Sequence, residues 1–343
     1  MTRKRLLITT ALIALAAVVL YFVPDEKKPS FQKNQGKVFG TYYAVQYECT
    51  DDLHDSIQAA FKAFDASMSM FNPQSTLSRI NKTAIGLTDS YFRDMYFTAL
   101  EVNRLSEGAF DITVAPLVNL WGFGLKNREH VTAEQVAELL PHIGMNKIGL
   151  MNVGDSLVYL VKSDSLVQLD AGAIAKGQSC DMIAALLTRN GCNNFLVDIG
   201  GEIVARGCNA EGNPWRIGIT RPIDDALGEI NEVQAVLQCS DIAMATSGNY
   251  RNFYYDGEQK RSHTIDPRTG YPVQHSLLSA TVQSNSCMRA DALATACMVL
   301  GYERALQMIE KDSLSACYLI VADSITDTES VTLRTIHSSR WKE

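Results

Sequence analysis

The chain has 343 residues, of which 46% are hydrophobic and 20% are charged, and its formal net charge is −7. This length holds one large domain or two ordinary ones, and the composition is typical of a globular protein with ample apolar material for a core. No Lys- or Arg-rich run follows the first five residues, so the chain lacks the basic stripe that nucleic-acid-binding proteins usually carry.

The first thirty residues form a separate segment. Basic residues at positions 3–5 precede an uncharged run, 6–23, of eighteen residues, which is the pattern of an export signal. The run is just long enough to span a bilayer, and its small-x-small cleavage candidates lie inside it rather than at its end. We expect an uncleaved anchor with the basic flank in the cytoplasm and the bulk of the chain outside; a cleaved signal is the alternative. The flanking charges and the polar linker that follows disfavour a buried core helix.

The eight cysteines would suffice for four disulfides in an exported protein, but their spacing does not form a disulfide framework. Several of them lie among apolar or helical neighbours, where free cysteine behaves as a small hydrophobe. No CxxC occurs in the sequence, so metal binding by cysteine is disfavoured.

Between residue 36 and residue 148 the sequence pattern predicts mostly helices. Residues 36–48 alternate like a strand, and a helix with apolar positions at 57, 61 and 64 follows, capped near position 51 or 52. Another helix covers 91–106. A small helix follows position 131, where Thr132 and Gln135 form a possible capping box.

The second half, from Gly149, predicts mostly strands, with helices at 178–189, 287–300 and 302–311. No repeat of fixed period is present. Strands paired with helices, with hairpin turns between them, predict one mixed α+β unit rather than a regular doubly wound sheet. We expect strands at 157–161, 166–170, 194–207, 215–220, 235–239, 275–284, 316–323 and 330–336.

Four glycine-containing junctions follow apolar strand patterns: "LDAGAIAKG", "VDIGGEIVARG", "TSGNYRNFY" and the loop "HTIDPRTG". Glycine lets a backbone approach a ligand and turns amides toward it, which suits phosphate, although each junction alone is also explained by a tight turn. None matches a P-loop or a dinucleotide-binding fingerprint. Four together favour a phosphate-bearing ligand.

Two aspartates are candidates for chemistry. In "MRADALATA", Asp291 and Thr295 are four residues apart on a predicted helix, so their oxygens share one face. With a backbone carbonyl they would make an all-oxygen site for Mg²⁺; the alternative is that Asp291 only caps the helix. Asp170 ends an apolar strand pattern and is either functional or turn-forming. Trp121 and Phe123 either stack on an aromatic ligand or belong to the core.

Six segments together carry a family resemblance: "GAFDITVAPLVNLWGFG" (108–124), "LDAGAIAKG" (169–177), "VDIGGEI" (197–203), "TSGNYRNF" (246–253), "HTIDPRTGYPV" (263–273) and "ADALATACMVLG" (290–301). In this order the chain resembles the ApbE family of FAD:protein FMN transferases. The resemblance implies an ApbE-type α+β domain over 36–343, behind a signal or anchor segment and linker at 1–30. It also implies Mg²⁺-dependent transfer of FMN from FAD to a threonine of a partner protein, with release of AMP.

The resemblance also implies roles for individual residues. Asp291 and Thr295 match metal ligands, and Ala173 matches the residue that adds a backbone carbonyl. Lys176 stands where some members carry glutamate, and Phe39 and Phe71 stand where others carry methionine and tyrosine. His263 lies in a shaped loop and is a candidate catalytic residue together with Asp291; its role as base or phosphate binder stays open. The residues expected to contact FAD are Phe39, Phe71, Ala109, Phe110, Asp111, Asp170, Lys176 and Ile265.

Function and location follow as expectations of the same resemblance. The acceptors would be flavoprotein subunits of respiratory or electron-transfer complexes, of the sodium-translocating NADH:quinone oxidoreductase or Rnf type, and no nucleic acid is involved. The enzyme would be anchored in the inner membrane with its catalytic domain on the periplasmic side. The alternatives are an FAD pyrophosphatase that yields FMN and AMP, and a non-catalytic FAD-binding protein.

Overall fold

A computed structural model of the chain describes residues 28–124, 131–222, 232–249, 253–256, 259–326 and 330–342. Its centre is an eight-stranded sheet in the order β1-β2-β6-β7-β10-β13-β14-β15, in which every neighbouring pair is antiparallel. The strands are β1 (Ser30–Val38), β2 (Thr41–Cys49), β6 (Phe195–Ile199), β7 (Glu202–Arg206), β10 (Ile242–Gly248), β13 (Leu277–Ser284), β14 (Ala316–Thr326) and β15 (Ser330–His337).

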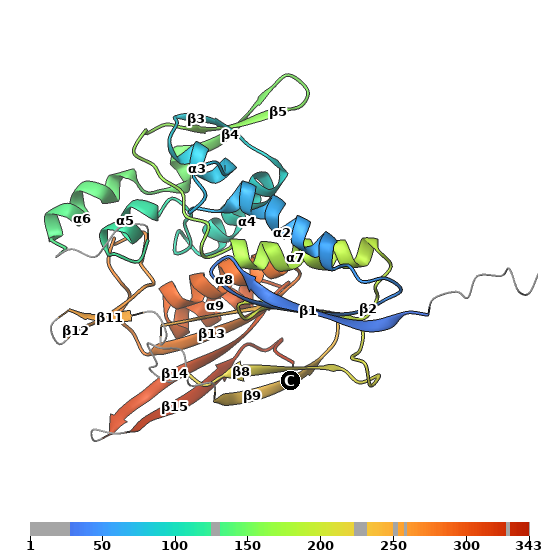
Figure 1. The fold of residues 1–343 in the computed structure, drawn as a ribbon. Coiled ribbons are helices and arrows are strands. Elements are labelled where there is room, and N and C mark those ends of the chain that lie inside the picture. The colour runs from blue at the N-terminus through green and yellow to red at the C-terminus, as the bar shows by residue number, and fades with distance from the viewer. Residues whose placement is uncertain are drawn as a thin grey trace, which may run out of the picture.

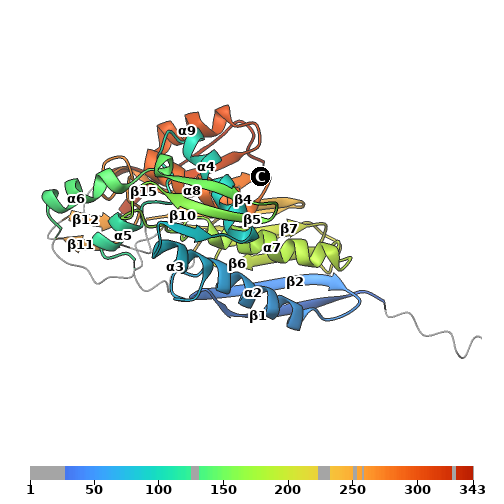
Figure 2. The ribbon, with the colours of Figure 1, turned by 90° about the horizontal axis from the view of Figure 1, so that it is seen from above.

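Helices cover one face of this sheet (Figure 1). The helix α7 (Ala175–Arg189) packs on β6 and β7, and α8 (Cys287–Leu300) packs on β10 and β13. The amphipathic helix α2 (His54–Met68) lies beside α7, and α4 (Ser90–Leu105) and α9 (Tyr302–Lys311) pack against α8 (Figure 2). Because α8 is enclosed by the sheet and these helices, eleven of its residues are buried. It is the central helix of the fold.

The opposite face of the sheet is covered by a hairpin of β8 (Trp215–Thr220) and β9 (Val233–Cys239). Its apolar side chains join those of β7, β10 and β14 and the ring of Trp341 in a separate hydrophobic cluster. The sheet is therefore apolar on both faces, and a core lies on each side of it.

Smaller elements lie above the helical face in Figure 1. A three-stranded sheet has the order β3-β5-β4, and its inward residue Leu160 belongs to the main core. The elements above the helical face are α3 (Thr76–Asn81), β3 (Ile85–Leu87), α5 (Ala115–Leu120), α6 (Ala133–Leu139), β4 (Ile148–Val153) and β5 (Leu157–Lys162), with 3₁₀ turns at Leu140–His142 and Met145–Lys147. The hairpin of β11 (Phe253–Asp256) and β12 (Gln259–Ser262) lies lower, at the left of the same view.

Most of the predicted elements are confirmed, and the fold class is mixed α+β as expected. The capping box is present: the Gln135 amide donates to the Thr132 hydroxyl, and the Thr132 amide donates to the Gln135 side chain. The helix expected to begin at 178 begins at Ala175, so the "AKG" segment forms its first turn.

Three strand predictions are wrong. The segment 194–207 is not one strand but the hairpin of β6 and β7, with Gly200 (φ +68°) and Gly201 (φ +99°) in its turn. The segment 36–48 is not one strand but the adjoining parts of β1 and β2, because Phe39 (φ +50°) and Gly40 (φ +76°) reverse the chain. β1 begins at Ser30, inside the expected linker. The strand expected at 166–170 is an isolated bridge between Gln168 and Val114, since the neighbouring segment turns to enter α7.

No helix within the described ranges has both the length and the apolarity needed to cross a bilayer. The expected anchor at 6–23 lies outside those ranges.

Candidate active site

The first turn of α7 meets the second turn of α8 at Asp291. The backbone amide of Gly177, the third residue of α7, donates to Asp291 Oδ2 across 3.0 Å. One turn further along α8, the Thr295 hydroxyl lies 3.3 Å from the hydroxyl of Ser247, at the end of β10. Three of the six motif segments are therefore in contact around one buried carboxylate and one hydroxyl.

The loop at 263–273 joins the same arrangement from the other side. The Thr264 hydroxyl donates to Asn249 Oδ1 across 2.7 Å, which ties this loop to the end of β10. The indole nitrogen of Trp121 donates to the Gly270 carbonyl across 2.8 Å. The "NLWGFG" segment and the "HTIDPRTG" loop are therefore held together, and Trp121, which is buried beside α6, belongs to the core rather than to an exposed stacking surface.

A further hydrogen bond between backbone groups links the first and last of these segments. The Asp170 amide donates to the Ile112 carbonyl across 2.7 Å, so the segment that leads into α7 is tied to the "GAFDIT" segment. The remaining motif joins at α7, where the Lys176 ammonium forms an ion pair with the Glu202 carboxylate at the start of β7. Five segments that are far apart in the sequence thus form a closed ring of hydrogen bonds, and the sixth is attached to it by the ion pair. We define this ring as the candidate site.

The charges within the ring are concentrated and mostly buried. Burial raises the pKa of Asp291, while the Lys176 ammonium and the Gly177 amide act in the opposite direction. Burial likewise raises the pKa of Glu202, Lys176 lowers it, and Asp291 raises it further. Burial lowers the pKa of Lys176, but Asp291 and Glu202 outweigh it, and the net pKa lies above the ordinary lysine value. Two buried carboxyl groups therefore lie around one ammonium in this part of the ring.

The residues expected to bind the metal are carried by α8 and by the segment that leads into α7. Asp291 and Thr295 lie one turn apart on α8, and Ala173 lies just before α7 begins. Within the described ranges, the Ala173 carbonyl accepts no hydrogen bond, and no donor reaches the second carboxylate oxygen of Asp291. Oxygen atoms of these three types suit Mg²⁺, so the residues present fit that ion.

His263 lies at the edge of the loop 263–273, half-buried, with its ring centroid 6.3 Å from that of Phe123. The loop is rigid at its turn because Asp266 accepts hydrogen bonds from the backbone and the guanidinium of Arg268, at 2.7–2.9 Å. Gly270 has φ +83°, and a Cβ there would lie 2.5 Å from Val136. The turn residues therefore hold the position of His263 rather than forming the reactive site themselves.

The "GAFD" side chains are directed into the protein. Phe110 is 2% exposed and belongs to the main core. Asp111 accepts from the amide and hydroxyl of Thr113 and from the Met145 amide; burial raises its pKa, and these bonds oppose the rise. Ala109 is also buried. Contacts with FAD from this segment would therefore come from its backbone, whose shape these side chains fix.

The other residues predicted to contact FAD differ in how deeply they are buried. Ile265 is buried in a cluster with Trp121. Phe39 packs on Phe61 and Phe64 of α2, and its positive φ is rare for a bulky residue and typical of functional positions. Phe71 is 78% exposed. Its neighbour, Met70, lies close to the Asp170–Gly172 turn, where the Asp170 carboxylate accepts from the Gly172 amide.

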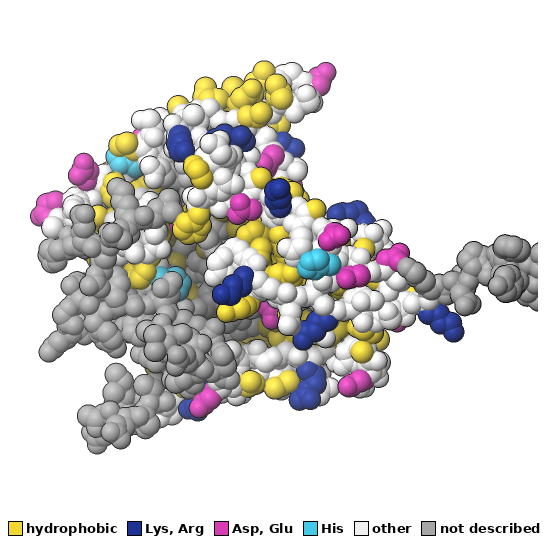
Figure 3. Space-filling model, viewed as in Figure 1, with side chains coloured by type: hydrophobic (Ala, Val, Ile, Leu, Met, Phe, Trp, Pro, Cys, Tyr) yellow, Lys and Arg dark blue, Asp and Glu magenta, His cyan; other side chains and the backbone are white. Residues whose placement is uncertain are grey.

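The surface near the ring is hollowed, and hydrophobic side chains lie within the hollow (Figure 3). A cavity of about 280 Å³ is bordered by motif residues such as Gly200 and Thr246 and by β8 residues such as Arg216 and Gly218, so it faces the β8–β9 hairpin, on the side of the sheet opposite α7 and α8. A larger cavity of about 500 Å³ lies beside the second half of α7, and no predicted site residue lines it. We place the site at the ring rather than at the larger cavity because the charged and motif residues gather at the ring.

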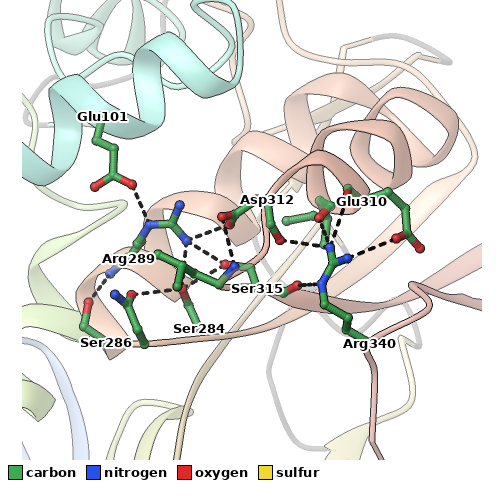
Figure 4. A network of polar contacts seen from close by, with 11 residues as sticks. Glu101, Ser284, Ser286, Arg289, Glu310, Asp312, Ser315 and Arg340 are labelled. Atoms are coloured by element: carbon green, nitrogen blue, oxygen red, sulfur yellow. Dashed lines mark hydrogen bonds and ion pairs between the residues drawn. The ribbon is translucent and has the colours of Figure 1, made fainter.

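A second polar network, centred on Arg289, holds the side of α8 that faces α4 (Figure 4). Arg289, which is 4% exposed, bonds Glu101 of α4 at 2.9 Å, Asp312 at 2.7 Å and Ser315 at 2.6 Å. The helix that carries the candidate metal ligands is therefore fixed on both sides.

Comparisons with known proteins assign the chain to a family. The model of the ApbE family matches residues 39–319. The chain belongs to the ApbE family. It is 38% identical to an FAD:protein FMN transferase of Haemophilus influenzae, covering 90% of this chain and 92% of that protein, and 33% identical to one of Escherichia coli K12, covering 91% and 92%. The flavin transferase ApbE from Vibrio cholerae has a similar structure, with a TM-score of 0.78, 34% identity, and coverage of 91% of this chain and 98% of that one.

Membership of the ApbE family confirms the resemblance that the six segments predicted, and with it the class of enzyme. Sequence reasoning missed two acidic residues that the structure of this ApbE-family chain brings to α7 and α8. Glu202 is a carboxylate inside the start of a buried strand, and Asp181 lies four residues after Gly177 on the same face of a largely apolar helix. In both cases the available signal was a charged residue within an otherwise apolar stretch.

Proposed function

We propose that this protein transfers FMN from FAD to a threonine hydroxyl of a partner protein in a Mg²⁺-dependent reaction that releases AMP. A bond forms between the threonine oxygen and the phosphorus of the FMN half, and the bond from that phosphorus to the bridging oxygen breaks. AMP leaves with the bridging oxygen. The observation that supports the proposal is the hydrogen-bonded ring, which joins the buried Asp291 carboxylate and the Thr295 hydroxyl on α8 to the start of α7, just after the Ala173 carbonyl.

Asp291, Thr295 and the Ala173 carbonyl would hold the magnesium ion. When bound, Mg²⁺ supplies neutralisation of the pyrophosphate charge and of the leaving phosphate. The family names of the relatives support FAD as the donor substrate.

The protein's own groups contribute positioning and charge. The amino-terminal end of α7, a helix of fifteen residues, carries a partial positive charge beside Asp291, and Lys176 adds a full one. Both favour an anionic pyrophosphate. His263, on the rigid loop, is the proposed acceptor of the threonine proton. Positioning and electrostatics carry most of phosphoryl transfer, so the enzyme needs no nucleophile of its own.

Two other functions use the same site. Water in place of threonine would make the protein an FAD pyrophosphatase, and binding without chemistry would make it an FAD carrier. The free oxygens around Asp291 favour an enzyme over a carrier, because binding alone does not need a metal on the pyrophosphate. Incubation with FAD, Mg²⁺ and a candidate acceptor, followed by the acceptor's mass, separates the transferase from the other two.

We also propose where the enzyme acts. The basic flank and the apolar run 6–23 support an inner-membrane anchor with the catalytic domain in the periplasm. The acceptors would be flavoprotein subunits of electron-transfer complexes of the sodium-translocating NADH:quinone oxidoreductase or Rnf type. Recovery of the mature protein from the soluble periplasmic fraction, with its amino terminus beyond residue 20, would contradict the anchor.

A further inference from the structure

The first turn of α8 is capped by a carboxylate from α7. The backbone amides of Cys287 and Met288 donate to the two oxygens of Asp181, at 2.9 and 2.8 Å. These amides are the first two of α8 and have no acceptor within their own helix. Asp181 is not one of the residues matched to metal or FAD, yet both of its oxygens are committed to the helix that carries Asp291.

The capping is reciprocal. Asp291 of α8 accepts the amide of Gly177 in the first turn of α7, while Asp181 of α7 accepts amides from the first turn of α8. Gly177 and Asp181 are four residues apart on α7, as Cys287 and Asp291 are on α8, so each pair lies on one face. The two helices thus run in opposite directions along their contact, and each amino terminus faces a carboxylate in the second turn of the other.

The contact between the helices is very close. A Cβ on Gly177 would lie 2.3 Å from the backbone carbonyl oxygen of Cys287. At this separation, sliding or tilting α8 relative to α7 breaks the Asp181 bonds and the Gly177–Asp291 bond together. The Ala173 carbonyl precedes α7, whereas Asp291 and Thr295 lie on α8, so the same displacement changes the separation of the proposed metal ligands.

We propose that Asp181 is a positioning residue for the magnesium site: it holds α8 against α7 so that the Ala173 carbonyl and the Asp291 and Thr295 oxygens are arranged to bind one cation. This inference rests on the proposed magnesium site. Asp181 acts through the first turn of α8 and touches neither metal nor FAD. It differs from Asp291 in that both of its oxygens are used for capping, whereas Asp291 uses one and keeps the other for a ligand.

The test compares three variants of the full-length protein. Asp181→Ala removes both acceptors, and Asp181→Asn keeps one acceptor oxygen. Trp341→Leu is the control, because Trp341 packs in the cluster on the opposite face of the sheet and its loss lowers stability without touching α7 or α8. For each protein, the melting temperature is followed as Mg²⁺ is added in the presence of FAD, and amide hydrogen exchange is measured at Gly177 without metal.

We expect Asp181→Ala to raise the half-saturating Mg²⁺ concentration by about 10- to 100-fold, the range typical of residues that orient metal ligands, and Asp181→Asn to raise it less. Exchange at Gly177 should be faster in Asp181→Ala, although its own acceptor Asp291 is intact. Trp341→Leu should melt at a lower temperature with an unchanged Mg²⁺ midpoint and unchanged exchange at Gly177.

Two outcomes would overturn the inference at different levels. If the wild-type protein responds to Mg²⁺ and Asp181→Ala has the same midpoint while only melting earlier, Asp181 is merely a helix cap. If the wild-type protein does not respond to Mg²⁺ at all, the proposed magnesium site is wrong and the positioning role is lost with it.

Discussion

Replacing Asp291 separates its structural contact from its proposed chemistry. One oxygen of the carboxylate accepts the Gly177 amide at 3.0 Å, and the other is available to a ligand. Asp291→Asn keeps a neutral acceptor for Gly177 but removes the one carboxylate among the proposed metal ligands. With the pyrophosphate charge poorly neutralised, the barrier should rise by about 3–5 kcal/mol, which corresponds to a loss of roughly a hundredfold to several thousandfold in rate.

Asp291→Asn and Asp291→Ala should differ in stability even though both remove the carboxylate. Asp291→Asn removes a buried charge and keeps the hydrogen bond, so its melting temperature should stay close to that of the wild type. Asp291→Ala leaves the Gly177 amide without an acceptor and should lose a further 1–3 kcal/mol, approximately, of unfolding free energy. The assay is the initial rate of AMP release against Mg²⁺ concentration, with a melting curve for each protein. If Asp291→Asn keeps the wild-type rate at saturating FAD, the metal assignment is refuted.

Other variants test separate parts of the account. Gly177→Ala should lower both the melting temperature and the transfer rate, because a Cβ would meet the α8 backbone at 2.3 Å, whereas Gly149→Ala, with no atom within 4 Å, should change neither. Arg289→Met should lower the unfolding free energy in a denaturant titration by about 3–5 kcal/mol, since it leaves the buried Asp312 carboxylate unpaired, and an added Asp312→Asn should restore part of that loss. Burial lowers the pKa of His275 in the folded protein, so the unfolded chain takes up this proton first as the pH falls. The unfolding free energy should therefore decrease below about pH 6.5, by at most about 1.4 kcal/mol per pH unit. If His275→Gln shows the same dependence of unfolding free energy on pH as the wild type, this prediction is contradicted.

Much of the fold was predictable because local patterns and tertiary contacts agree. The helix α8 begins at a Ser286 cap and ends at Gly301, and α6 begins at its capping box; both signals are local in the sequence. The strand expected at 166–170 failed for a tertiary reason. Its apolar residues Val167 and Leu169 are buried by neighbouring elements, while the backbone forms a bridge only at Gln168.

The site was predictable only in part. The oxygens of Asp291 and Thr295 share a helix face, and that follows from spacing alone. Nothing local shows that the Lys176 ammonium meets Glu202, or that Asp181 caps a helix that begins more than a hundred residues later. Such contacts depend on how α7 and α8 pack on the sheet, and the glycine at 177 makes sense only when the other helix is in place.

The most direct test of the central claim is the intact mass of an acceptor protein after incubation with the enzyme, FAD and Mg²⁺. The account predicts that the acceptor gains the mass of one FMN less one water, that one AMP appears for each acceptor modified, and that an acceptor with its target threonine changed to valine gains nothing. If AMP is released at the same rate with or without acceptor and the mass of the acceptor does not change, the protein hydrolyses FAD, and the proposed transfer is contradicted.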